Sequence, residues 1–186
     1  MTFTPRRIIL KNKESVQVRQ AVPEDAAQLI ETIQTYIRDS EHLVLTTAEF
    51  QPTLEKEMEW ISSFLQSNNS LLLVALKDGN IIGNIDLNGS TRIKLQHTAM
   101  VGMGMLRQWR NTGLGTALLT AAIEWAVGNP VLEQLWLQVY HNNAAGMALY
   151  HKCGFREQGR QADFFKVTEG SYADNVLMGL SVKKGS

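Results

Sequence analysis

A glycine-rich loop at residues 110–116 has the residue types that bind phosphate groups. It reads Arg-Asn-Thr-Gly-Leu-Gly-Thr, and it joins the apolar run Met100–Leu106 to a helical pattern that begins at once. A helix start offers unpaired N–H groups and the positive end of the helix dipole, and glycine lets a diphosphate approach the main chain closely. Arg107 and Arg110 add positive charge. The segment therefore indicates an anionic cofactor bound at a loop-to-helix turn.

Two better-known phosphate loops do not fit this segment. The P-loop ends in Gly-Lys-Ser or Gly-Lys-Thr, and neither triplet occurs in the sequence. The dinucleotide-binding fingerprint requires three glycines in the turn after a strand. Gly102 and Gly104 supply two, but Arg107 stands in the third position and both glycines fall inside the strand pattern. Because short glycine motifs often occur by chance, the loop alone is also compatible with a turn that binds nothing.

A second motif, Asn143–Phe155, is more specific. Its asparagine precedes a helical segment and can cap the start of that helix by accepting a backbone N–H bond. Tyr150 lies two turns further on, and Gly154 ends the helix before a strand begins at Phe155. In this order, the glycine loop and the second motif resemble the GNAT superfamily of acetyl-CoA-dependent N-acetyltransferases. The resemblance covers Thr98–Arg160 closely and the earlier elements loosely.

The resemblance implies a cofactor and the residues that bind it. In these enzymes two neighbouring parallel strands splay apart, and the pantetheine arm of acetyl-CoA lies in the gap. The first such strand is then Val101–Leu106, where Met103 and Met105 offer main-chain groups, and the second is Leu135–Tyr140. The other implied cofactor-binding residues are Arg110, Asn111, Thr112, Gly113, Leu114, Gly115, Thr116, Asn143 and Tyr150. Gly146 replaces the alanine usual in the family, at a cost of roughly 1 kcal/mol of helix propensity. No metal is implied.

Direct acetyl transfer to an amine in a ternary complex needs a base and an acid. An amine with a pKa of about 10 must lose a proton before it attacks the thioester, and the leaving thiolate needs a proton or a hydrogen bond. The resemblance assigns the acid to Tyr150. Many family members place a glutamate on the splayed strand, but the corresponding segment 97–100 reads His-Thr-Ala-Met and has no carboxylate. His97, whose imidazole titrates near neutral pH, and Asp86 on the preceding strand are the candidate bases.

The residues that bind the acceptor are expected in variable parts of the fold. The loop Ser40–Gln51 commonly borders the acceptor pocket in this family. Glu41 in that loop, with Tyr172 and Asp174 near the last strand, are the candidate substrate-binding residues, since acidic groups suit a cationic amine. The sequence leaves open whether the acceptor is a small-molecule amine or a protein amine, and whether the acyl group is longer than acetyl. The resemblance is also compatible with a homodimer formed through the C-terminal strands.

Alternating apolar patterns predict the elements that position these residues. Helices are predicted from Pro23, from Pro52 with a buried stripe of Met58, Ile61 and Leu65, after the glycine loop, and over Ala144–Lys152. The predicted strands are Ser15–Ala21, Leu71–Leu76, Asn80–Leu87, Thr98–Leu106, Leu135–Tyr140, Phe155–Gln158 and Ala173–Val182. Helices interleaved with a mostly antiparallel sheet indicate an α/β (α+β) fold in one domain over residues 1–186. Residues 1–14 are expected to form an arm or an edge strand.

Composition excludes several classes of protein. The 186 residues carry 18 basic and 18 acidic side chains, and this zero net charge argues against a nucleic-acid-binding protein. A basic N-terminal cluster, with Lys11 and Lys13, is expected to be a solvated arm. No apolar run is long enough for a membrane span, and the N-terminus lacks the apolar stretch of a signal peptide. A single cysteine, Cys153, excludes an internal disulfide and suits a reducing compartment. These features predict a cytoplasmic protein without membrane or nucleic-acid partners.

Two other functions stay open. The missing strand glutamate favours an acyl-CoA-binding regulator or sensor that has the same fold and little catalysis. If both motifs serve only as turns, the chain is a structural or interaction domain. Binding of acetyl-CoA separates the last possibility from the other two, and turnover separates the enzyme from the regulator.

Overall fold

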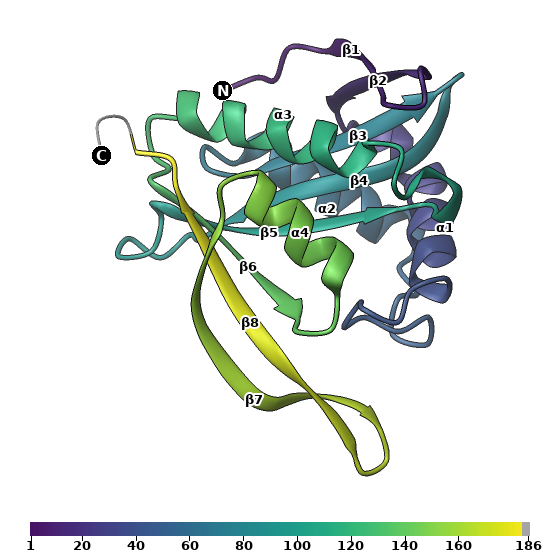
Figure 1. Cartoon of the computed structure of the whole chain (residues 1–186). Coiled ribbons are helices and arrows are strands. Elements are labelled where there is room, and N and C mark those ends of the chain that lie inside the picture. Colours follow the sequence, from purple (N-terminus) through teal and green to yellow (C-terminus); the bar gives the residue numbers. More distant parts are fainter. Residues whose placement is uncertain (184–186) are drawn as a thin grey trace.

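One mixed sheet organises the computed structural model, which describes residues 1–183; residues 184–186 of the expected domain lie outside the described part (Figure 1). Its strands are β1 (Arg6–Ile9), β2 (Ser15–Gln20), β3 (Leu71–Lys77), β4 (Asn80–Gly89), β5 (Thr98–Met105), β6 (Gln134–Tyr140), β7 (Arg156–Thr168) and β8 (Ser171–Ser181). Their order across the sheet is β1-β2-β3-β4-β5-β6-β8-β7, and every neighbouring pair is antiparallel except β5 and β6. The predicted mixed, mostly antiparallel sheet is confirmed.

The α-helices of the described chain cover both faces of this sheet. Helices α1 (Ala26–Arg38) and α2 (Leu54–Gln66) lie on one face, and α3 (Leu114–Gly128) and α4 (Ala144–Lys152) lie on the other (Figure 1). Successive side chains of β3 enter opposite cores, Leu73 with α3 and Leu72 with α1 and α2. Burial on both faces explains why this strand reads as a continuous apolar run. No helix within residues 1–183 is long and apolar enough to cross a membrane.

Helix α2 buries a different stripe from the one predicted. Met58 and Leu65 are exposed, at 38% and 43% of their surface, whereas Glu57, Ile61 and Phe64 face the core. The predicted set of residues 58, 61 and 65 and the buried set of residues 57, 61 and 64 both have helical spacing. A prediction based on apolar residues chooses the first set, because the second contains a glutamate. The prediction for Met58 and Leu65 was therefore wrong because a glutamate occupies a buried position.

The C-terminal strands are longer than predicted. Strands β7 and β8 form a hairpin that projects from the body of the molecule (Figure 1). Residues 159–168 belong to β7, although the prediction ended that strand at Gln158. Nearly all of β7 is exposed, so it has no apolar alternation to reveal it. At the end of β6, the ring of Tyr140 stacks on Phe165 of the hairpin with centroids 3.9 Å apart.

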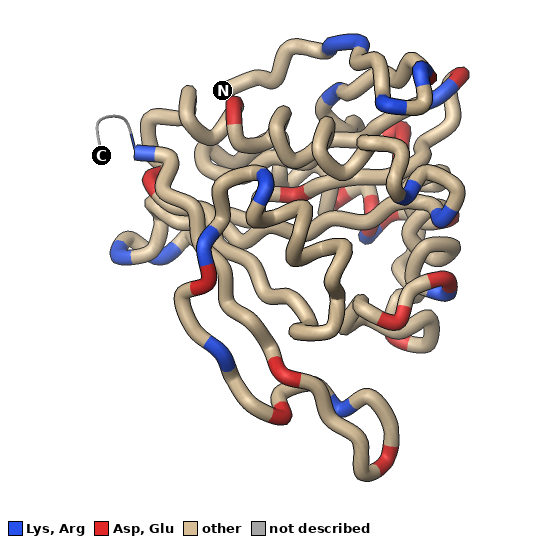
Figure 2. The backbone as a smooth tube through the Cα atoms, viewed as in Figure 1, with Lys and Arg blue, Asp and Glu red and all other residues tan. Residues whose placement is uncertain are grey.

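The N-terminal segment lies against α3 instead of extending as an arm. Strand β1 is the edge strand and pairs with β2. Arg6 forms an ion pair with Glu124 of α3 at 2.6 Å, and the indole N–H of Trp125 donates to the carbonyl of Met1 at 3.0 Å. Figure 2 shows the basic part of this segment in blue above α3. Leu10, at the end of the segment, is buried in the core on the α3 side.

Strands β5 and β6 diverge soon after they begin. They pair in parallel only where Thr98–Met100 meets Gln134–Trp136. Beyond Met100, β5 keeps its antiparallel pairing with β4 up to Met105, while its other edge has no strand partner. The splayed pair expected from the resemblance is therefore present, and it opens toward the start of α3 (Figure 1).

Candidate active site

A cavity of about 810 Å³ lies where β5 and β6 separate. Its walls come from both strands, from α4, from the loop before α3, from the α1–α2 loop and from the β1–β2 turn. The predicted site residues that line it are Met103, Met105, Arg110, Asn111, Gly113, Gly115, Thr116, Asn143 and Tyr150. The structure thus brings the two sequence motifs to one cavity.

Cations line this cavity and acids do not. Its lining includes Lys11, Arg110 and Lys152, and no Asp or Glu of the described residues. None of the three cations forms an ion pair with a carboxylate in residues 1–183. In a chain with no net charge, three unpaired cations around one cavity favour an anionic ligand.

The loop before α3 leaves several main-chain donors free. The N–H groups of residues 111–113 donate to no acceptor in the described part of the chain, and those of the first turn of α3 have no helical partner. Asn111 and Gly113 have left-handed φ angles of 64° and 96°. Left-handed residues in a turn direct neighbouring N–H groups into an anion-binding concavity. Thr112 holds the loop in place, because its hydroxyl donates to the carbonyl of Trp109 at 2.7 Å.

Strand β5 directs the main chain of two methionines into the gap beside β6. The N–H of Leu106 donates to the carbonyl of Ile82, on the β4 side. Main-chain groups of successive strand residues point to opposite sides, so those of Met103 and Met105 point away from β4. Because β6 has already diverged, these groups face the cavity that both residues line.

Helix α4 begins with a cap that requires glycine nearby. The Oδ1 atom of Asn143 accepts the N–H of Gly146 at 2.9 Å, which leaves the Nδ2 group as a free donor at the cavity wall. A Cβ atom on residue 146 would lie 2.7 Å from that Nδ2 atom. Gly146 therefore makes room for the capping side chain, which offsets its low helix propensity.

Tyr150 faces the cavity from α4. Its ring packs edge to face against Phe155, with centroids 6.0 Å apart. Burial raises the pKa of the Tyr150 phenol to about 12, so the hydroxyl remains a donor at neutral pH. This hydroxyl forms no hydrogen bond with another residue among 1–183, and it is free to donate to a ligand.

A tyrosine and an aspartate occupy the space that two glycines leave on β5. The Tyr36 hydroxyl donates to Oδ1 of Asn84 at 3.1 Å, and a Cβ on Gly104 would lie 2.3 Å from the Tyr36 ring. A Cβ on Gly102 would lie 2.6 Å from Oδ1 of Asp86. Burial raises the pKa of Asp86 to about 6, which brings this carboxyl close to neutral pH. Gly102, Gly104 and Tyr36 all line the cavity.

Comparison with known proteins assigns the chain to a family. The family model described as "Acetyltransferase (GNAT) family" matches residues 29–155. The chain belongs to this GNAT family. The matched segment begins inside α1 and ends at Phe155, so it contains every wall of the cavity except the β1–β2 turn.

Relatives and solved structures agree with this assignment. The "L-amino acid N-acetyltransferase AaaT" of Escherichia coli (strain K12) is 28% identical over 106 residues, which are 57% of this chain and 65% of that relative. The match thus spans less than two thirds of that curated relative. An acetyltransferase of the GNAT family from Streptococcus pneumoniae is 30% identical, with a TM-score of 0.87 over 89% of this chain and 99% of its own. The putative acetyltransferase yncA from Salmonella typhimurium, solved with its cofactor acetyl-CoA, shares the fold at 17% identity, with a TM-score of 0.80 over 92% and 96% of the two chains.

The contact between Gly104 and Tyr36 predicts a stability effect. Gly104→Ala should lower the free energy of unfolding by about 1–3 kcal/mol, because Tyr36 is buried and tethered to Asn84 and cannot move away freely. Thermal unfolding measures the change, expected as a fall of about 2–12 °C in Tm. The matched control is Gly159→Ala, whose nearest neighbour would be 4.0 Å away, and which should leave Tm unchanged. Equal melting of the two variants would contradict this close approach.

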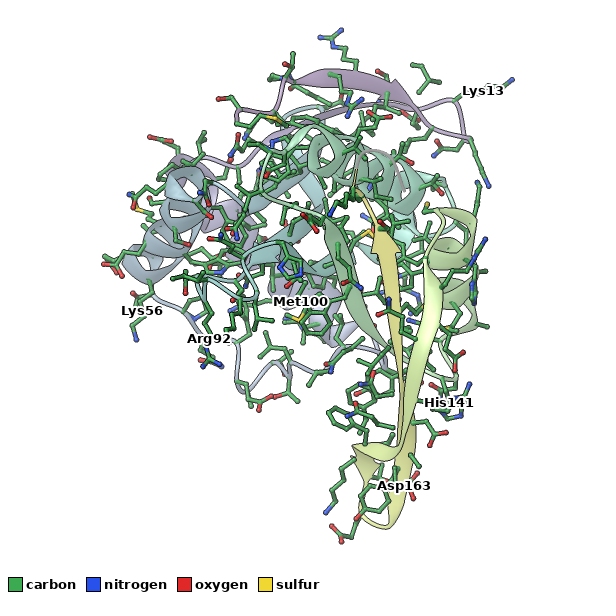
Figure 3. All side chains as sticks on the ribbon, turned by 90° about the vertical axis from the view of Figure 1, so that its left-hand side faces the viewer. Lys13, Lys56, Arg92, Met100, His141 and Asp163 are labelled. Carbon is green, nitrogen blue, oxygen red and sulfur yellow. The ribbon has the colours of Figure 1, made fainter. Side chains whose placement is uncertain are left out.

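Several predicted residues lie outside the cavity of this GNAT fold. His97 precedes β5 at the end opposite the cavity, where its carbonyl accepts the N–H of Glu133 at 2.8 Å. Tyr172 and Asp174 lie on β8, in the projecting hairpin, and Asp174 accepts the N–H of Asp163, which Figure 3 labels. Glu41 is exposed and does not line the cavity, although its neighbours Ser40 and His42 do. The structure does not bring these side chains to the glycine loop.

Tyr36 and part of the loop expected to border the acceptor pocket also line the cavity. Tyr36, which was not predicted from the sequence as a site residue, belongs to the buried face of α1. His42, Leu43 and Val44 come from the α1–α2 loop, and His42 packs edge to face on Tyr140 at 5.8 Å. The two glycines inside β5 were the sequence feature that could have indicated a side chain packed on this strand, because glycine in a strand often marks the close approach of another group.

Proposed function

We propose that the protein is an N-acetyltransferase that moves an acetyl group from acetyl-CoA to a primary amine by direct attack in a ternary complex. The observation that carries the proposal is one cavity that joins free main-chain donors, three unpaired cations and Tyr150, with Asp86 beside its β5 wall. The free main-chain donors and the cations suit the phosphates of acetyl-CoA, Tyr150 suits the thioester sulfur, and Asp86 suits the amine. Membership of the GNAT family supports the same activity.

The residues of the cavity fit acetyl-CoA. The N–H groups of residues 111–116 suit the diphosphate, together with Arg110. Arg110 donates one bond to the carbonyl of Asp39 at 3.0 Å and retains other guanidinium donors. The main chain of Met103 and Met105 and the Nδ2 group of Asn143 suit the amides of the pantetheine arm. Thr112 and Leu114 contribute main chain only, because the Thr112 hydroxyl is already bonded and the Leu114 side chain is buried in the core.

Asp86 is the base in this proposal. Its pKa of about 6 leaves the carboxylate ionised at neutral pH and more basic than an ordinary aspartate. Gly102 has no side chain to cover this carboxylate on the side of the cavity. An ammonium group therefore has a proton acceptor beside the gap between β5 and β6. The N–H of Met105 can stabilise the negative charge that develops on the thioester oxygen.

In this proposal Tyr150 acts on the departing sulfur by donating a hydrogen bond to it. Its hydroxyl is protonated over the whole working range of pH, because burial raises its pKa to about 12. Cys153 does not line the cavity, and burial raises the pKa of its thiol, so it is a poor nucleophile at neutral pH. Direct attack by the amine is therefore favoured over an acetyl-cysteine route.

The α1–α2 loop forms the wall that suits the acceptor. Ser40, His42, Leu43 and Val44 line the cavity there, next to Tyr36. The L-amino acids named for the relative AaaT are the first acceptors to test, followed by other small-molecule amines and protein N-termini. A regulator that binds acyl-CoA without catalysis is the competing function. The presence of Asp86 on β4 favours the enzyme over the regulator, because it supplies a carboxylate that the corresponding segment of β5 lacks.

Thermal unfolding with ligands tests the proposal first. Acetyl-CoA at a hundred times its Kd should stabilise the protein by about 2.7 kcal/mol, which corresponds to a rise of about 5–10 °C in Tm. CoA should act similarly, while ATP, which has phosphates and adenine but no pantetheine, should act weakly. Thiol release in the presence of amines then measures turnover. Absence of any shift with millimolar acetyl-CoA would overturn the proposal, and binding without turnover on any amine would favour the regulator.

A further inference from the structure

The turn between β1 and β2 contacts the glycine loop directly. The N–H of Lys11 in this turn donates to the carbonyl of Thr112 at 2.9 Å. The Cγ atom of Lys11 lies 3.2 Å from the position that a Cβ on Gly113 would take. The absence of a side chain at Gly113 therefore lets the apolar stem of Lys11 lie along the loop, and Lys11 lines the same cavity as Arg110.

The fold holds this turn in place. Leu10 is buried in the core on the α3 side, and its N–H donates to the carbonyl of Glu14 at 2.9 Å. Glu14 forms an ion pair with Lys77 of β3. The Lys11 main chain is thus fixed on both sides, so its ammonium is restricted to the neighbourhood of the loop.

Lys11 has no protein partner for its charge. Within residues 1–183 its ammonium forms no ion pair and no hydrogen bond, whereas Arg6 and Lys77 nearby are both paired with carboxylates. A second hollow, of about 210 Å³, borders the first at Lys11, Gly113 and Thr116. The surface is therefore concave on both sides of this unpaired cation.

We propose that Lys11 binds a phosphate group of acetyl-CoA, an inference that rests on the proposed function. The loop 110–116 contains one cation, Arg110, whereas CoA carries a diphosphate and a 3′-phosphate, and a phosphate monoester alone has a charge of about −1.5 to −2 at pH 7. Lys11 supplies a second cation at the loop. It lies in the turn between β1 and β2, outside residues 29–155 that the family model matches.

Calorimetric titration of the whole chain tests this role without measuring turnover. The ligands are CoA, 3′-dephospho-CoA and pantetheine, and the variants are Lys11→Met and Lys13→Met at one ionic strength. Lys11→Met should raise the Kd of CoA about 10- to 100-fold, because a hydrogen-bonded ion pair is lost. Lys13→Met removes the same charge from the same turn and should change that Kd less than about twofold, since solvent and salt screen it. Lys13 does not line the cavity, and Figure 3 shows it pointing away from the fold.

The ligands identify which phosphate is bound. A loss of affinity for CoA but not for 3′-dephospho-CoA assigns Lys11 to the 3′-phosphate, and a loss for both assigns it to the diphosphate. Pantetheine, which has no phosphate, should bind both variants equally. An equal Kd of CoA for Lys11→Met and Lys13→Met would overturn the proposal, as would a loss that extends to pantetheine, because the turn itself would then be distorted. Failure of the unmodified protein to bind CoA would instead contradict the proposed function.

Discussion

Replacement of Tyr150 by phenylalanine should lower kcat about 10²- to 10³-fold, while the Kd of acetyl-CoA changes less than about twofold. The substitution removes one hydroxyl that no other described residue uses. It keeps the ring that packs against Phe155, so α4 and its cap at Asn143 should be undisturbed. Kinetics at saturating substrate, together with calorimetric binding of acetyl-CoA, separate the two quantities.

The raised pKa of Tyr150 determines how its hydroxyl can act. Complete transfer of a proton from a phenol of pKa about 12 to a thiolate of ordinary pKa is strongly uphill. The effect on kcat therefore arises from a hydrogen bond that strengthens as charge develops on sulfur, which is an interaction made mainly in the transition state. Rate–pH profiles of the unmodified enzyme should accordingly show no loss of activity caused by Tyr150 below about pH 11.

A matched control removes another tyrosine hydroxyl. Tyr172 lies on the projecting hairpin, half-exposed and outside the cavity, so Tyr172→Phe should leave kcat unchanged. Equal turnover by Tyr150→Phe and the unmodified enzyme would remove Tyr150 from the mechanism. A fall in kcat for Tyr172→Phe would instead place the hairpin in the acceptor site, as the sequence had suggested.

Local signals explain which parts of the site could be predicted. The left-handed φ of Gly113 and the cap from Asn143 to Gly146 join residues that are neighbours in the sequence, and the residue types alone indicate them. The predicted helix over Ala144–Lys152 has the bounds found in the structure. The strands of the sheet's centre were equally accessible, because apolar runs broken by Asp78 and Gly79 are typical of a hairpin.

Contacts between distant segments explain what the sequence could not show. Tyr36 reaches the cavity because two glycines of β5 pair with residues of β4 and leave room on that face. Lys11 reaches the glycine loop because β1 and β2 form the edge of the sheet beside α3. Neither placement has a local signature, since each depends on strand register and helix docking. The hairpin of β7 and β8 was missed for a different reason, because an exposed polar strand lacks apolar alternation.

Asp86→Asn should lower kcat/KM about 10²- to 10⁴-fold at pH 8, the range expected when a general base is lost. For the unmodified enzyme, kcat/KM should rise with pH until Asp86 is ionised, at about pH 6. The variant keeps the shape of the side chain beside Gly102 but cannot accept the proton. Its profile should therefore lack the rise around pH 6, while the rise that belongs to the acceptor amine persists in both enzymes.

Asp86→Asn should raise the thermal stability of the protein at pH 8, although it lowers the activity. Burial raises the pKa of Asp86 in the folded state above that of the unfolded chain, so the folded state binds the proton more tightly. The favourable contribution of the protonated carboxyl is present below the unfolded pKa and is lost as pH rises through about 6. Above that pH the ionised carboxylate destabilises the fold. Asp86→Asn should consequently melt at a higher temperature than the unmodified protein at pH 8, and the difference should shrink as pH falls toward about 4.

A carboxylate in an exposed turn gives the control for both effects. Asp78→Asn changes the same group at the β3–β4 turn, where asparagine tolerates the left-handed φ of 50°. This variant should keep the activity, the pH profile and the melting temperature of the unmodified protein. If Asp86→Asn lost stability together with activity, Asp86 would be a structural carboxylate and not a base. A large loss of activity with a gain in stability would show that the fold retains a buried charge because catalysis requires it.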